Sequence, residues 1–323
     1  MDYRPRFTID SKTLNLVADI VSLVERVPKE FMTSEGLKLR KINRVRSVQS
    51  SLAIDGNSLS QKDVTNISNS KKISGEPKEI LEVKNALSAF REIDQYDPAS
   101  AEDLLNAHRT MTAGVAVRPG KFRNSEIGFF KDGVPVHIAP DSEDVPDMIK
   151  ELMRWYRDTD LHPLIKGCIF HCRFEYIHPF IEGNGRMSRL WQSLILSKWR
   201  PILGHLPVEE YVLKNKRSYN GALSEADKGN VDVFIKFMLT MIKWALEDLI
   251  KEASFAPARG ADTETSILEM IKSNPRITAA AMADSLNVNE RTIKRYLSSM
   301  VKRGMVRRVG SDKTGHWGTI DNW

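Results

Sequence analysis

The chain has 323 residues, which is enough to bury a large core and to form two or three domains. Hydrophobic residues make up 41% and charged residues 28%, an ordinary globular balance, and no apolar run approaches the roughly 18–20 residues that span a bilayer. The net charge of +6 is uneven, because from Arg259 onward 11 lysines and arginines face 7 aspartates and glutamates, which favours an anionic partner for the C-terminal part.

The N-terminal residues MDYRPRFTID contain no apolar segment after a basic start, so they do not read as a secretion signal. The two cysteines, Cys168 and Cys172, are four residues apart in a predicted helix, where a disulfide is geometrically awkward. We therefore expect a reducing, cytoplasmic location and no membrane partner.

Apolar residues at helical spacing predict that most of the chain is helical. The clearest such segments are 11–27, 36–53, 79–94, 101–113 and 144–158. The exception is 121–139, where two short apolar runs flank Lys131-Asp132-Gly133, which is a hairpin signal. One isolated hairpin cannot form a sheet core, so we expect it to lie over another part of the fold.

Residues 163–200 combine a helix that runs to about Ile177, a break at Pro179, a glycine-rich turn and a second helix from about Arg186. Glycines let successive backbone N–H groups point inward, and the dipole of the following helix favours an anion. Because Arg186 and Arg189 are three residues apart, both project from one side of the first helical turn. This arrangement predicts a polyphosphate site.

Two further side chains in this segment suggest a reaction at that site. A carboxylate beside phosphates would repel them unless a divalent cation lay between, so Glu182 suggests Mg²⁺. His178 closes the preceding helix, and its pKa suits proton transfer near neutrality. A lone histidine at a helix end is more often structural, but the whole set predicts phosphoryl-type transfer by positioning and electrostatics.

The string HPFIEGNGRMSR, His178–Arg189, matches the Fic signature H-P-F-x-[D/E]-G-N-G-R-x-x-R at every specified position. The chain therefore resembles the Fic family, and the similarity extends to EPKEILEVKNAL, LLNAHRTM and PGKFR. The resemblance implies an all-α fold with an N-terminal helical region at 1–100 and a mainly helical catalytic core at 101–253. The one β-hairpin would be the flap of that core.

The resemblance implies a protein adenylyltransferase, which moves AMP from ATP to a hydroxyl of a target protein. His178 would be the general base and Glu182 would hold Mg²⁺. The residues assigned to the nucleotide are Gly183, Asn184, Gly185, Arg186, Arg189, Tyr219 and Asp227. The first three would cradle the phosphates, the arginines would bind the β- and γ-phosphates, and the last two would contact the adenosine. The family often has Asn where Asp227 stands.

The flap would hold an extended segment of the target by strand addition. Its residues are Ile127, Gly128, Phe129 and Phe130. Phe180 is expected to pack in the core and fix the loop. The expected acceptors are an unknown target protein and the chain itself.

Many Fic proteins carry an inhibitory helix with the pattern [S/T]-x-x-x-E-[G/N], and residues 51–57 read SLAIDGN at the end of a predicted helix near 36–57. Ser51 and Gly56 fit this pattern, but the acid is Asp55 instead of Glu. The resemblance implies that the acid pairs with Arg189 and blocks productive seating of the γ-phosphate. Because Asp is one methylene shorter, the brake would be weaker or act through a shifted backbone. The alternative is a helix that simply ends in a glycine cap.

Small residues at 254–263 predict a linker, and 264–323 then resembles a winged helix-turn-helix domain with three helices and a small hairpin. Its third helix places Arg291, Lys294 and Arg295 on one face, which suits duplex DNA. The alternative is a module for dimerisation, which implies a homodimer, or for docking of the target, because this fold serves both DNA binding and protein contacts.

Two other functions stay open beside AMP transfer. One is a DNA-binding regulator whose Fic core senses nucleotide, and the intact His178 argues against it because a sensor needs no base. The other is a hydrolase that removes AMP from a modified protein. Asp55 argues against the hydrolase, because in the family that reaction relies on the inhibitory Glu to position water.

Overall fold

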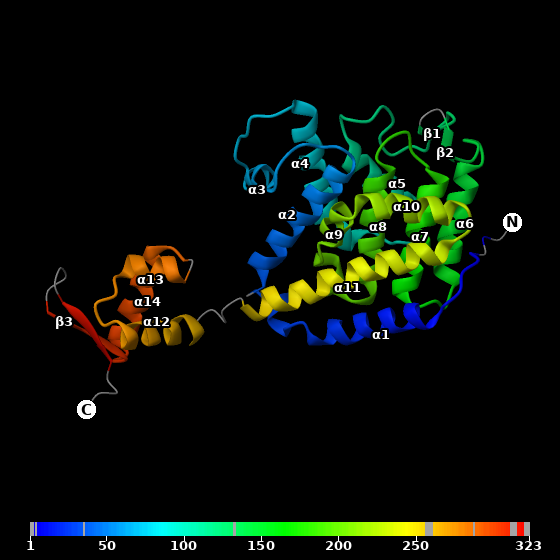
Figure 1. Ribbon diagram of the computed structural model, residues 1–323. Coiled ribbons are helices and arrows are strands. Elements are labelled where there is room, and N and C mark those ends of the chain that lie inside the picture. Colours follow the sequence, from blue (N-terminus) through cyan, green and yellow to red (C-terminus); the bar gives the residue numbers. More distant parts are fainter. Residues whose placement is uncertain are drawn as a thin grey trace. The chain divides into compact units, whose positions relative to one another are not determined.

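The computed structural model describes residues 3, 5–34, 36–131, 134–255, 261–286, 288–310 and 315–319. The chain divides into two compact units, Met1–Ala253 and Ser254–Trp323. Figure 1 shows that both are mainly helical, which confirms the predicted fold class. None of the helices in the described ranges combines the length and the apolar character needed to cross a membrane.

The helices of the first unit are α1 (Ser11–Arg26), α2 (Leu37–Ile54), α3 (Gln61–Ser68), α4 (Pro77–Arg91), α5 (Ala101–Thr112), α6 (Val145–Asp158), α7 (Pro163–Ile177), α8 (Asn184–Trp199), α9 (Val208–Lys214), α10 (Lys216–Asp227) and α11 (Val231–Phe255). Strands β1 (Gly128–Lys131) and β2 (Val134–Ile138) pair in antiparallel fashion, with an irregularity between Phe129 and Phe130. The predicted hairpin is therefore confirmed, and Asp132 and Gly133 at its turn lie outside the described residues.

Polar caps define several helix starts. Asp10, Ser60 and Ser100 each accept a hydrogen bond from a backbone N–H in the first turn of α1, α3 and α5. α8 begins at Asn184, two residues before the expected start, because Gly183 with φ +86° already acts as its N-cap. This earlier start places the predicted phosphate-binding residues in the first turn of the helix.

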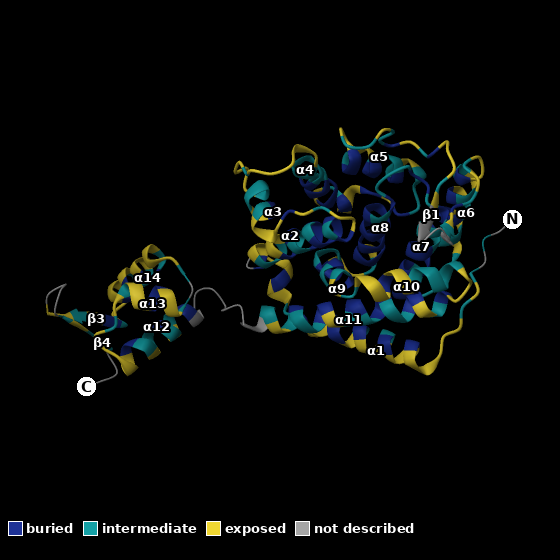
Figure 2. Ribbon diagram, turned by 45° about the horizontal axis from the view of Figure 1, so that its top comes forward, coloured by how far each residue is buried: buried dark blue, intermediate teal, exposed yellow. Residues whose placement is uncertain are grey.

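The antiparallel pair α7 and α8 lies at the centre of the first unit, as Figure 1 and the burial colouring of Figure 2 show. One apolar core lies on the side of α1, α9 and α11, and it includes Ile169 of α7 and Leu196 of α8. The other lies on the side of α2, α4, α5 and α6, and it includes Phe174 of α7 and Trp191 of α8. The connection between α7 and α8 is therefore held between two cores.

The second unit contains α12 (Ala261–Ser273), α13 (Ala279–Ser285), α14 (Glu290–Lys302) and the antiparallel strands β3 (Val306–Val309) and β4 (His316–Thr319). Its core is small and includes Ile267, Ile293 and Met300. The predicted linker at 254–263 overlaps helices at both ends, since α11 runs to Phe255 and α12 begins at Ala261. Residues 256–260 lie outside the described ranges.

Candidate active site

The loop between α7 and α8 starts at His178, whose backbone conformation is strained. This residue has φ 49° and ψ 60°, in the left-handed region that side chains other than glycine rarely adopt. Its N–H donates to the carbonyl of Phe174 and so closes α7. Strain of this kind persists only where the surroundings hold it, and it is common at functional sites.

Arg123 supplies that support from the loop before β1. Its buried guanidinium donates from Nε to the carbonyl of His178 at 2.9 Å and from Nη1 to the carbonyl of Ser125 at 3.0 Å, and it also donates to the carbonyl of Pro140. Its backbone N–H donates to the carbonyl of Pro179 at 2.9 Å. One side chain therefore ties both ends of the hairpin to the end of α7.

The imidazole of His178 is oriented for proton uptake. Its Nδ1 lies 3.3 Å from the carbonyl oxygen of Glu175, which can only accept, so Nδ1 carries the hydrogen and Nε2 carries the lone pair. The side chain is 14% exposed, and burial lowers the pKa of His178 to about 4. At neutral pH the ring is thus neutral and able to take a proton.

Asn184 fixes the turn that follows. Its Nδ2 donates to the carbonyl of Phe180 at 2.8 Å, and its Oδ1 accepts from the N–H of Phe180 at 2.9 Å. Both polar atoms of the Asn184 side chain are therefore bonded within the loop. Asn184 would contact a ligand through its backbone N–H at the start of α8. Phe180 is fully buried, as expected, and its ring stacks on His108 with centroids 3.6 Å apart.

His108 of α5 fixes the backbone of the same turn through hydrogen bonds. Its Nδ1 accepts from the N–H of Gly120 at 2.9 Å, so its Nε2 carries the hydrogen and donates to the carbonyl of Glu182 at 3.0 Å. Burial lowers the pKa of His108 to about 4, which keeps it in this neutral state. The backbone of the predicted phosphate loop is therefore fixed before any ligand arrives.

Arg186 and Arg189 converge, as their spacing predicted, and Asp55 lies between them. Asp55 Oδ1 accepts from Arg189 Nη2 at 3.0 Å, and Asp55 Oδ2 lies 3.4 Å from Arg186 Nε. Arg186 Nε and Nη1 are buried and make no hydrogen bond among the described residues. Buried donors of this kind are costly unless a ligand satisfies them, so they suit an anion such as a phosphate.

The end of α2 holds Arg189 with further contacts. Arg189 Nε donates to Ser51 Oγ at 2.9 Å, and Nη2 donates to the carbonyl of Ser51 at 2.8 Å. The predicted meeting of Asp55 and Arg189 is therefore present, and the shorter acid does reach. A Cβ at Gly185 would lie 2.9 Å from Arg189 Nη1 and 3.1 Å from Asp55 Oδ1, so only glycine leaves room for this pair.

The glycine cap is present at the same helix end. Gly56 has φ +101°, the N–H of Asn57 donates to the carbonyl of Leu52, and the N–H of Gly56 donates to that of Ala53. These two bonds define a Schellman motif, which favours glycine at this position. The cap and the contact with Arg189 are not alternatives, because the cap is what orients Asp55.

A second carboxylate lies beside Arg186, and it was not predicted from the sequence. Glu82 of α4 lies 3.6 Å from Arg186 Nη1 and accepts a hydrogen bond from Asn57 Nδ2 at 2.9 Å. It falls in the segment EPKEILEVKNAL, whose likeness to the family was noted without a role for this residue. Helix periodicity could have placed Glu82 on one face of α4, but only the fold brings that face to Arg186.

Glu182, the expected Mg²⁺ ligand, is half-buried in the turn whose backbone His108 holds. Among the described residues no group of three His, Cys, Asp or Glu side chains could hold a metal ion. One carboxylate beside a phosphate site fits Mg²⁺, which proteins usually hold with one or two carboxylates plus substrate phosphates and water.

The two residues expected at the adenosine differ in their surroundings. Tyr219 is 3% exposed, and its hydroxyl lies 2.9 Å from His171 Nε2 in the core. Asp227 Oδ2 lies 2.8 Å from His137 Nδ1, and His137 belongs to β2. Asp227 therefore links α10 to the hairpin. The adenosine contacts stay a prediction for both residues.

The hairpin lies beside the loop between α7 and α8, since the rings of His137 and His178 have centroids 6.3 Å apart. Ile127 accepts a hydrogen bond at its carbonyl from the N–H of Ala139, and Gly128 opens β1. The side chains of Phe129 and Phe130 lie outside the described residues.

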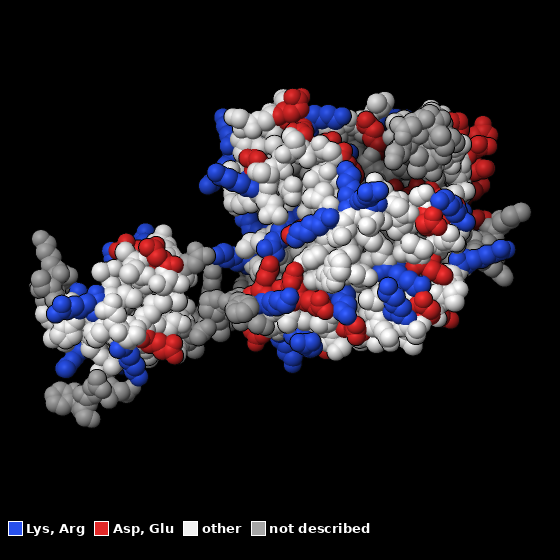
Figure 3. Space-filling model, in the orientation of Figure 1, with Lys and Arg blue, Asp and Glu red and all other residues white. Residues whose placement is uncertain are grey.

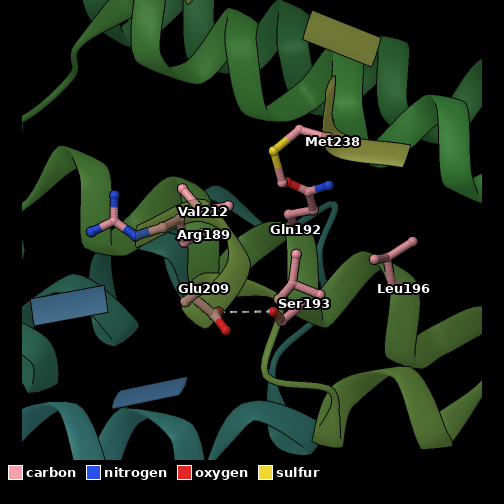
Figure 4. A pocket seen from close by; sticks show the side chains of 8 residues that line it. Arg189, Gln192, Ser193, Leu196, Glu209, Val212 and Met238 are labelled. Carbon is pink, nitrogen blue, oxygen red and sulfur yellow. Dashed lines mark hydrogen bonds between the residues drawn. The ribbon is translucent and has the colours of Figure 1, made fainter. Parts of the chain in front are cut away.

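A cavity of about 10 Å³ lies behind Arg189, and Gln192, Ser193 and Glu209 are among its lining residues. This volume is about that of one water molecule. Figure 4 shows the Arg189 guanidinium extending away from the cavity while Ser193 and Glu209 point toward each other. Burial raises the pKa of Glu209. Arg189 is thus packed on its inner side and presents its charge to Asp55.

Two protein families match separate parts of this chain. The Fic/DOC family matches residues 98–196, and a winged helix-turn-helix DNA-binding family matches residues 261–307. The crystal structure of a Fic family protein from Desulfovibrio desulfuricans G20 superimposes with a TM-score of 0.78 at 30% identity, covering 99% of each chain. The chain belongs to the Fic family.

The curated relatives of this Fic protein are named protein adenylyltransferase Fic. The protein from Drosophila erecta is 31% identical over 160 residues, which is 46% of this chain and 30% of that protein. The protein from Drosophila persimilis is 26% identical over 272 residues, which is 77% of this chain and 48% of that protein. The chain thus spans about a third to a half of the length of these relatives.

The second unit of this Fic protein has the helices and hairpin of a winged helix, which confirms the predicted fold. Arg291, Lys294 and Arg295 are all exposed on α14, and Lys294 pairs with Glu290 at 2.7 Å. On the face drawn in Figure 3, basic and acidic side chains of this unit are interspersed. The buried side of α14 carries Ile293, so the expected basic face is the solvent face.

Proposed function

We propose that this protein is an adenylyltransferase that transfers AMP from ATP to a hydroxyl of a target protein. The observation that carries the proposal is a neutral histidine with its Nε2 lone pair, placed one short turn before an anion site with unsatisfied arginine N–H groups. A sensor would need only the anion site. The names of the curated relatives support the same reaction.

In the proposed reaction, His178 Nε2 takes the proton of the target hydroxyl as its oxygen attacks the α-phosphorus of ATP. A new O–P bond forms, the bond from the α-phosphorus to the bridging oxygen breaks, and pyrophosphate leaves. The backbone N–H groups at the start of α8 and the guanidinium of Arg186 would bind the phosphates. Their effect is electrostatic, because preorganised donors stabilise the charge that develops on the phosphoryl oxygens.

Glu182 would hold the Mg²⁺ of the nucleotide. The ion, when bound, neutralises phosphate charge. The hydrogen bond from His108 to the carbonyl of Glu182 holds the backbone from which this carboxylate extends.

We further propose that α2 restrains the enzyme in its resting state. Ser51 and Asp55 occupy the Arg189 guanidinium, and Asp55 and Glu82 flank Arg186. A γ-phosphate that used Arg189 would have to displace these contacts. α2 and α4 therefore act together on the two arginines.

The test is to incubate the purified full chain with α-labelled ATP and Mg²⁺, with and without a cell lysate, and to identify labelled proteins by mass spectrometry. AMP on a hydroxyl side chain, of this chain or of a lysate protein, is expected. Label that appears only as free nucleotide, with no modified protein even for the Asp55→Gly variant, would reject the transfer reaction.

A second candidate function concerns the C-terminal unit. The match to a winged helix-turn-helix DNA-binding family and the exposed basic residues of α14 support binding to duplex DNA. Docking or dimerisation is the competing use of this unit. A duplex-binding measurement over a range of salt concentrations separates them.

A further inference from the structure

Glu175 occupies a costly place for a carboxylate. It lies in the last turn of α7, where the negative end of the helix dipole disfavours an anion, and its side chain is only 13% exposed. Ser188 Oγ donates a hydrogen bond to Oε1, and Oε2 lies 3.9 Å from His178 Nδ1. A buried acid that the fold disfavours and that faces a candidate base points to a functional role.

The groups around this acid come from four other elements. Arg189 of α8 and His137 of β2 favour its charged form, whereas Asp55 of α2 and Tyr219 of α10 oppose it in their charged forms. The ion pair of Arg189 goes to Asp55, and Arg189 also donates hydrogen bonds to Ser51. The partner of Glu175 at ion-pair distance is His178.

Burial is the strongest influence on the protonation of His178 and lowers its pKa, against the hydrogen bond to the carbonyl of Glu175, which favours the imidazolium. His137 and Arg123 disfavour the imidazolium, and burial does so more strongly. The negative charge of Asp55 favours it. A base that must become positive during the reaction therefore needs a nearby negative charge.

We propose that Glu175 is a positioning residue for His178. The backbone carbonyl of Glu175 keeps the hydrogen on Nδ1, and its carboxylate stabilises the imidazolium that forms when Nε2 takes the proton of the target hydroxyl. This inference rests on the proposed transfer reaction. No atom of Glu175 enters the bond changes. The hydroxyl proton moves to Nε2, Nδ1 keeps its hydrogen, and the carboxylate offsets the new charge from 3.9 Å.

The pair should titrate as a unit. Burial raises the pKa of Glu175 to about 6, and burial lowers the pKa of His178 to about 4. Two groups this close share their first proton, so the competent state, with a carboxylate and a neutral imidazole, is lost as pH falls through about 6. Without the carboxylate, only the lower pKa of His178 would limit the reaction on the acid side.

Glu175→Gln separates this role from a structural one. We measure the single-turnover rate of self-modification between pH 5 and pH 9 with saturating ATP and Mg²⁺, in the Asp55→Gly background. The variant should be at least tenfold slower at pH 8, and its acid limb should move from about pH 6 toward lower pH. The concentration of ATP that gives half the maximal rate should change less than threefold.

Two further variants keep the test decisive. Ser188→Ala removes the hydrogen bond to Oε1 and retains the charge, so it should slow the rate less than Glu175→Gln does. Because that hydrogen bond lowers the pKa of Glu175, its loss should move the acid limb to higher pH, opposite to the shift in Glu175→Gln. Glu175→Asp retains the negative charge on a side chain that is one methylene shorter. Its rate should lie between those of Glu175→Gln and the wild type. A uniform loss of rate in Glu175→Gln with an unmoved acid limb would overturn the proposal, as would a loss confined to ATP affinity.

A titration by NMR makes the outcome independent of the transfer reaction. The ring signals of His178, assigned by their loss in His178→Ala, should titrate at lower pH in Glu175→Gln than in the wild type. An unchanged titration would overturn the role of Glu175 even if transfer is active. A shifted titration in a protein that transfers no AMP would instead reject the proposed function and keep the pair.

Discussion

Replacing Asp55 by Gly tests whether the end of α2 restrains the enzyme. The carboxylate accepts from Arg189 at 3.0 Å, lies 3.4 Å from Arg186, and is 30% exposed. A hydrogen bond between charged groups contributes about 1.5–3 kcal/mol, and partial exposure screens it, so ~1–2 kcal/mol is at stake. Since 1.36 kcal/mol is tenfold in rate, self-modification should rise about 5- to 30-fold. Ser51 still contacts Arg189, so the release is incomplete.

The assay compares initial rates of labelling from α-labelled ATP at a fixed, subsaturating ATP concentration. Asp55→Asn retains an acceptor for Arg189 but loses the charge, so its rate should lie between those of the wild type and the Gly form. Asp19→Asn is the matched control. Asp19 pairs with Lys243 at 2.6 Å on the surface between α1 and α11, away from the arginines, and its loss should leave the rate unchanged.

Equal rates for the wild type, Asp55→Gly and Asp55→Asn would refute the reasoning. They would mean that the contact between Asp55 and Arg189 is only a packing contact of a capped helix end and does not affect the rate of AMP transfer. Activation by Asp19→Asn of the same size would also refute it, because the effect would then follow from a general loosening of the fold.

Three further outcomes are expected. His178→Ala should abolish AMP transfer while calorimetry still detects ATP binding, because the anion site is untouched; transfer at the wild-type rate would exclude His178 as the base. Glu182→Gln should raise the Mg²⁺ concentration needed for half-maximal labelling, and Asn184→Ala should weaken ATP binding because the loop loses its two hydrogen bonds to Phe180; unchanged values for both would contradict the anion site. The full chain should bind duplex DNA with an affinity that falls steeply as salt rises, and Arg295→Ala should weaken it; no binding at low salt would favour the docking role of the C-terminal unit.

The sequence was informative where function depends on neighbours along the chain. The end of α7 near Ile177, the turn after it and the common direction of Arg186 and Arg189 all follow from local spacing, and the structure agrees with each. The pairing of Asp55 with Arg189 joins distant segments, and it was predicted only because a known pattern connected them. Spacing alone contains no information on that contact.

The rest depends on contacts between segments that no local pattern relates. Arg123 stands 55 residues before the carbonyl that it holds, and His108 stands 74 residues before the one that it holds. Both lie in segments whose similarity to the family was noted without a role. Glu175 is close to His178 in sequence, but its importance depends on burial, and a periodic pattern cannot distinguish a buried carboxylate from an exposed one.

The two cores that share α7 and α8 have a consequence for the kinetics of opening. The loop between α7 and α8 joins helices whose side chains are buried on both sides, so it cannot loosen unless one of the two cores also opens. Backbone amides inside the loop, such as that of Phe180, should therefore exchange with solvent deuterium almost as slowly as amides in the middle of α8. Loops usually exchange fast, and this one should behave as a part of the protein interior that happens to carry the chemistry.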